Sequence, residues 1–162
     1  MPSPASIPLH AVAVHFPIAG AFFAAAALAI GVARSSARSA SLNTAALLLV
    51  ATLAGGITAV VTGWLWADQL AYLAGGWGPI PGPMAVEGLA RQHALLALAF
   101  VSVASVALAL TLAARKRERP PVLALFAAVL ACGLVAAAGH LGGTMVHAPP
   151  APKDEASAPA AR

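Results

Sequence analysis

The chain carries five histidines, and these are the residues best suited to chemistry: His10, His15, His93, His140 and His147. Imidazole binds zinc, copper and haem iron, and it titrates near neutral pH. The sequence contains no His-Glu-x-x-His zinc motif, P-loop, dinucleotide-binding glycine motif or nucleophile elbow. Its single cysteine, Cys132, excludes an intrachain disulfide and covalent haem attachment through Cys-x-x-Cys-His. Any chemistry therefore depends on where the fold places the histidines.

Composition indicates a membrane protein, because 60% of the residues are hydrophobic and only 9% are charged, whereas soluble domains carry about a quarter charged residues. Four apolar stretches approach or exceed the roughly 20 residues that cross a bilayer, at about 11–33, 45–67, 93–114 and 121–147. In lipid, only a helix satisfies the backbone hydrogen bonds of such a run within the segment itself. We predict an all-α fold, an integral membrane four-helix bundle, as a single domain over residues 1–147. A disordered Pro/Ala-rich tail is expected over residues 148–162.

The loop charges predict the orientation of these helices. Basic residues concentrate in the first connection, at Arg34 and Arg38, and in the third, over residues 115–119, whereas the second connection has one Arg against two acidic residues. The positive-inside rule then places the first and third connections in the cytoplasm and both termini on the non-cytoplasmic side. The residues before the first apolar run contain no Lys or Arg, so we interpret that run as a retained helix rather than a signal peptide. We expect a multi-pass protein of a bacterial-type inner membrane, surrounded by lipid and without nucleic-acid binding.

Counting along each helix from its cytoplasmic end places three histidines at one depth. At about 1.5 Å per residue, His15 lies roughly 27 Å, His93 roughly 31 Å and His140 roughly 28 Å from that end. Asp68 lies slightly further from the cytoplasmic end than these three histidines, and His10 and His147 lie further still. Asp68, His10 and His147 therefore form a second tier of candidates. Bundle cores build cofactor sites from side chains on facing helices.

We therefore predict a haem b or redox-metal site formed by His15, His93 and His140, serving membrane electron transfer. Two of them would suffice for a six-coordinate haem, and small residues beside His140 leave room for a macrocycle. Two alternatives stay open: a non-catalytic membrane subunit that packs against a redox or transport partner, and a copper- or zinc-binding membrane protein. The sequence leaves enzymatic activity undecided, and we favour a role that is not enzymatic by itself.

Small residues are concentrated in the second and fourth helices, at Gly55, Gly56, Gly63, Gly139, Gly142 and Gly143. Such residues let transmembrane backbones approach closely, which predicts a tight bundle. Gly/Ala-rich faces are also compatible with a homo-oligomer.

Several motifs resemble a known family. The chain has Val-His-Phe-Pro-Ile-Ala at 14–19, Thr-Gly-Trp at 62–64, His-Ala at 93–94 and Gly-His-Leu-Gly-Gly-Thr-Met-Val-His at 139–147. These resemble the motifs of a bacterial membrane family called domain of unknown function 2231, over roughly residues 9–147. The chain departs from the family pattern at Ala11, where relatives have Pro, and after His147, where Ala-Pro-Pro replaces Gly. The resemblance implies a four-helix membrane protein, and a cytochrome or other redox membrane partner, because some relatives are joined to cytochrome-like modules.

Overall fold

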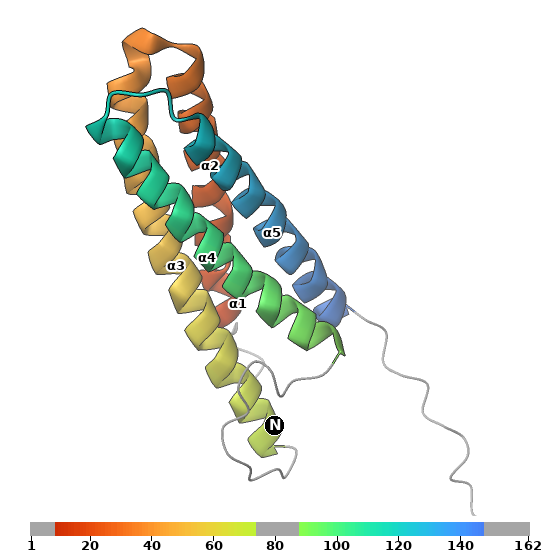
Figure 1. The fold of residues 1–162 in the computed structure, drawn as a ribbon. Helices are drawn as coiled ribbons and strands as arrows, with labels where there is room; N and C mark the ends of the chain where they lie inside the picture. Colours follow the sequence, from red (N-terminus) through yellow and green to blue (C-terminus); the bar gives the residue numbers. More distant parts are fainter. Residues whose placement is uncertain (1–8, 74–87, 148–162) are drawn as a thin grey trace, which may run out of the picture.

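The computed structural model describes residues 9–73 and 88–147, which form four long helices packed side by side (Figure 1). In chain order the elements are α1 (Leu9–Ala13), α2 (His15–Ala33), the 3₁₀ turn η1 (Ser35–Ala37), α3 (Arg38–Leu73), α4 (Gly88–Lys116) and α5 (Val122–His147). The long helices contact one another in a ring: α2 packs on α3, α3 on α4, α4 on α5, and α5 on α2. The described residues contain no strand, and the predicted all-α bundle is confirmed.

Four helices are long and apolar enough to cross a membrane, with spans at 15–33, 35–64, 88–116 and 122–144. Large apolar side chains cover the outside of the bundle: Phe16, Phe23, Leu47, Leu123 and Phe126 are each at least 65% exposed. In water such a surface would drive aggregation, whereas hydrocarbon chains solvate it. The protein is a multi-pass membrane protein.

The interior is built from small side chains. One cluster of buried residues joins Ala24, Ala27, Leu28, Leu42, Ala45, Leu49, Ala107, Ala124 and Ala128, and a second joins Ala21, Phe100, Ala104, Ala131, Cys132 and Val135. Because alanine projects so little beyond the backbone, helices that meet on alanine pack closely, and close packing is the main attraction between helices in lipid. The predicted tight bundle therefore has a physical basis in the core composition.

Two helices, α3 and α4, begin earlier in the chain than their apolar stretches suggest. α3 starts at Arg38 and α4 at Gly88, whereas their apolar stretches start near 45 and 93. α3 has 36 residues, or about 54 Å at 1.5 Å per residue, while the hydrocarbon core measures about 30 Å. An apolar run marks only the part of a helix that lies inside hydrocarbon. Polar turns extend the helix past the hydrocarbon core.

The first apolar run forms two helices, because the chain breaks at Val14, between α1 and α2. Pro17 lies in the first turn of α2, where its missing N–H removes the helical hydrogen bond that residue 17 would donate to Ala13. The Val14 N–H still donates to the His10 carbonyl at 3.1 Å. α1 packs against both α2 and α3.

The two connections that the structure describes lie at the same end of the bundle, which we call the loop end (residues 34–38 and 117–121; Figure 1). Arg38 Nε donates to the Gly31 carbonyl at 3.2 Å and so caps α2. The second turn uses Glu118 with φ 52°. The opposite end, which carries α1 and the first turns of α4, is called the histidine end.

Candidate histidine site

His10 is fixed at the histidine end by a hydrogen bond to the neighbouring helix. The side chain is partly buried, and its Nδ1 lies 2.9 Å from the carbonyl oxygen of Ala59 on α3. The Thr62 hydroxyl lies 3.4 Å from the same nitrogen. A carbonyl only accepts hydrogen bonds, so Nδ1 carries the proton and Nε2 of the neutral ring carries the lone pair.

His93 is held in the same way on the other side of the bundle. Its ring projects from α4, and Nδ1 donates to the carbonyl of Ala138 on α5 at 2.8 Å. Here too the proton on Nδ1 leaves a lone pair on Nε2 of the neutral ring. Both imidazoles therefore have the same tautomer, set by a backbone carbonyl of an adjacent helix.

The two rings contact each other. Their centroids are 6.2 Å apart and their planes are inclined by 81°, an edge-to-face arrangement. That separation is usual for aromatic pairs, which prefer 4.5–7 Å.

Each ring lies against a glycine. A Cβ atom on Gly63 of α3 would lie 2.8 Å from His10 Cε1, and one on Gly142 of α5 would lie 3.2 Å from His93 Cε1. A side chain at Gly63 would collide with the His10 ring, and one at Gly142 would require the His93 ring to shift by a few tenths of an ångström. From sequence, the glycines near His140 were interpreted as room for a macrocycle; at Gly142 the histidine ring itself uses that room.

Burial affects the protonation of His10. Desolvation is the largest influence and lowers its pKa below 6.5; the bond to Ala59 acts in the opposite direction, and the charge of His93 lowers the pKa further. His10 is therefore neutral at pH 7. A neutral imidazole is the form that binds metal ions, so burial favours coordination over protonation.

The other candidates are placed differently. His15 on α2 and His140 on α5 are both exposed at the bundle surface, and the described structure brings His93 together with His10 instead. Among the side chains that the structure describes, no group of three or more His, Cys, Asp or Glu is arranged to hold a metal ion. The side chains of Asp68 and His147 lie outside the described part of the structure.

Depth counting put His10 in the second tier because it lies five residues before His15, or about 7.5 Å further along the helix axis. In the structure the first apolar run divides into α1 and α2 at Val14, and His10 of α1 lies beside Ala59 of α3. Pro17 was the available signal, since proline favours the first turn of a helix and thus indicates a start near residue 15.

A family described as "Predicted membrane protein (DUF2231)" matches residues 6–149. The match includes the histidine pair, both glycines and all four spans. No curated protein and no solved structure matches the chain.

Proposed function

The chain belongs to the DUF2231 family of membrane proteins, and on that premise we propose that it is a membrane redox subunit whose His10 and His93 hold a transition-metal centre, copper or haem iron. The observation that carries the proposal is the matched orientation of the two rings. Each Nδ1–H donates to a backbone carbonyl, at 2.9 Å for His10 and 2.8 Å for His93. Histidines that bind metals almost always donate the second ring nitrogen in this way, which fixes the ring and makes the ligating nitrogen more basic.

A copper ion or haem iron held by this pair would supply one-electron transfer. Copper and haem iron both accept imidazole ligands and both change oxidation state. The ring centroids lie 6.2 Å apart, so a metal ion bound to one imidazole would lie close to the other. Gly63 and Gly142 are in contact with the rings, so a macrocycle would extend beyond them, whereas a copper ion needs no such space. The electron partner would be a cytochrome or another redox protein of the bacterial inner membrane that reaches the histidine end.

The test uses the full chain purified in detergent and supplied separately with copper, zinc or haemin. We expect one equivalent of copper or haem per chain, seen by elemental analysis and by an electron paramagnetic resonance signal or a Soret band. His10→Ala and His93→Ala should each weaken binding at least tenfold. The matched control is His140→Ala, which removes an exposed imidazole and should bind as the unaltered protein does.

Three results would overturn the proposal: no stoichiometric copper or haem, binding that survives both variants, or binding lost only in His140→Ala. Stoichiometric zinc with neither copper nor haem would exclude the redox role.

A second candidate function has its own observation. The bonds from His10 to Ala59 and from His93 to Ala138 join α1 to α3 and α4 to α5, as expected if the pair holds together a non-catalytic subunit that packs against a redox or transport partner. Under that function both alanine variants lower thermal stability in metal-free protein, and a partner co-purifies without metal or chromophore.

A further inference from the structure

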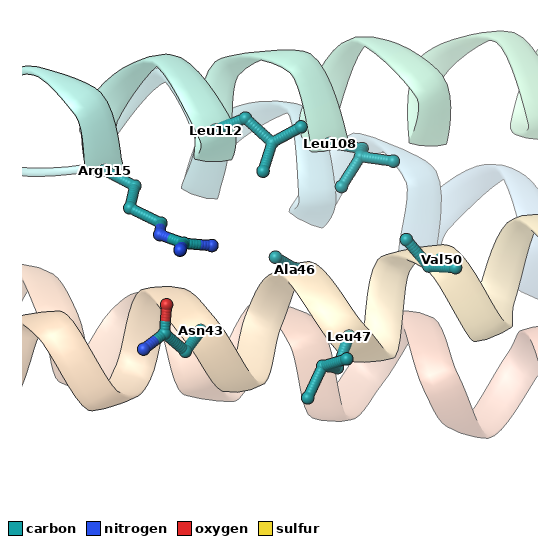
Figure 2. A pocket seen from close by; sticks show the side chains of 7 residues that line it. All are labelled: Asn43, Ala46, Leu47, Val50, Leu108, Leu112 and Arg115. Carbon is teal, nitrogen blue, oxygen red and sulfur yellow. The ribbon is translucent and has the colours of Figure 1, made fainter.

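A groove between α3 and α4 at the loop end combines apolar walls with a cationic mouth. It has a volume of about 330 Å³ and is lined by Asn43, Ala46, Leu47, Val50, Leu108, Leu112 and Arg115. Figure 2 shows the Arg115 guanidinium reaching from α4 toward the Asn43 amide on α3, with Leu112, Leu108 and Val50 further along the same gap. The polar and apolar parts are thus segregated along the groove.

The segregation follows the helix axes. Asn43 and Val50 on α3, and Arg115 and Leu108 on α4, are each seven residues apart, or roughly 10 Å along the helix. Both polar groups lie toward the loop end, where a span meets the polar interface. Both apolar ends lie toward the middle of the bundle, inside hydrocarbon. A ligand of matching shape has a polar head and an aliphatic chain at least as long as that interval.

The groove opens to the side of the bundle rather than to water. Three of its wall residues are exposed on the lipid-facing surface, Leu47 at 73%, Val50 at 55% and Leu112 at 46%. The molecules available at that surface are the lipids of the bilayer. Basic pockets between transmembrane helices at the interface are typical binding sites for anionic lipid headgroups.

The basic residues at the mouth of the groove favour anionic lipids over the other lipids of the bilayer. Residues 115–119 read Arg-Lys-Arg-Glu-Arg, four basic residues to one acidic. A guanidinium binds phosphate oxygens through short, charge-assisted hydrogen bonds, and the Asn43 amide adds a neutral donor. We propose that this groove binds one anionic phospholipid, with its phosphate at Arg115 and Asn43 and one acyl chain along Leu108, Leu112 and Val50.

The experiment titrates the delipidated full chain in detergent with phosphatidylglycerol or phosphatidylcholine of equal chain length, and counts bound lipid by native mass spectrometry. We expect one phosphatidylglycerol, held at least fivefold more tightly than phosphatidylcholine. Arg115→Gln should weaken phosphatidylglycerol binding about fivefold, as expected for the loss of one cation near an anionic lipid. Lys116→Gln makes the same charge change outside the groove and should alter binding less than twofold.

A second pair of variants tests the apolar half while leaving the charge intact. Leu112→Trp fills the groove and should weaken the binding of both lipids at least fivefold. Leu130→Trp changes another exposed leucine outside the groove, 56% exposed against 46% for Leu112, and should leave the binding of both lipids unchanged. Equal affinity for the two lipids overturns the proposal. So do equal losses in the two charge variants, or unaltered binding in Leu112→Trp.

Discussion

The contact between Gly63 and the His10 ring gives a prediction whose size can be worked out from the structure. Gly63→Ala places a Cβ 2.8 Å from His10 Cε1 and 3.1 Å from Nδ1, so the ring must move and its bond to Ala59 is lost. Overpacking costs about 1–3 kcal/mol, and the lost hydrogen bond about 0.5–1.5 kcal/mol. Replacing glycine by alanine in a helix returns about 0.5–1 kcal/mol. The net loss is about 0.5–4 kcal/mol.

A double-mutant cycle isolates this effect. The free energy of unfolding is measured in mixed micelles by titration with sodium dodecyl sulfate, for Gly63→Ala, His10→Ala and the double variant. Once His10 is alanine, the three atoms nearest to the new methyl group are gone, so Gly63→Ala should be neutral or stabilising by about 0.5–1 kcal/mol. Gly133→Ala is the control, because a Cβ there meets no atom within 4 Å.

Equal destabilisation by Gly63→Ala in both backgrounds would refute the reasoning, because the cost would then arise from something other than His10. A harmless Gly63→Ala in the unaltered protein would refute it as well. A useful second readout is the pKa of His10, followed by nuclear magnetic resonance of labelled histidine. Displacement from its buried position should raise that pKa toward 6.5, since burial is the main cause of its lowering.

Two further predictions concern pH and helix packing. Burial lowers the pKa of His10, which faces His93, so the unfolded chain binds more protons than the folded protein as the pH falls below 6.5. The contribution of His10 to the free energy of unfolding is therefore complete above pH 6.5 and is lost as the pH drops from there. Unfolding midpoints at pH 7.5 and 5.5 should show this fall, and an undiminished fall in His10→Ala would contradict it. Gly20→Ala would overlap the Thr52 hydroxyl and should cost about 1–3 kcal/mol, measured by the same titration. Adding Thr52→Ala should restore stability, because it removes that hydroxyl, which is buried without a hydrogen-bond partner among the described residues; no recovery would refute the contact.

Most of the fold was predictable because the bilayer allows few solutions. Apolar runs of about 20 residues in a chain with 9% charge leave helices as the only structure that satisfies its own backbone in lipid. The first residues of α3 and α4 were harder to predict, since the polar first turns at Arg38 and Gly88 carry no hydropathy signal. Helical hydrogen bonding continues there without regard to the solvent.

The site was predictable only in part. Height along a helix follows from residue counting, and His93 does lie at the histidine end, paired with another histidine. Rotation about the helix axis does not follow from counting, and it separates the exposed His15 and His140 from the half-buried His10. The role of Gly63 could not be predicted either, because the residue that it contacts, His10, is 53 positions away in the chain. Only the folded arrangement reveals that contact.

The two short turns at the loop end bear on how the chain enters a membrane. η1 and residues 117–121 make α2–α3 and α4–α5 into two helical hairpins whose tips lie at the same end. Both tips carry arginine, at Arg34 and Arg38 and over residues 115–119, and moving such charges through hydrocarbon is expensive. By the positive-inside rule, each hairpin would insert as a unit with its arginines on the side of synthesis. Biogenesis of this protein would then proceed in two steps, with assembly of the His10–His93 pair waiting for the second hairpin.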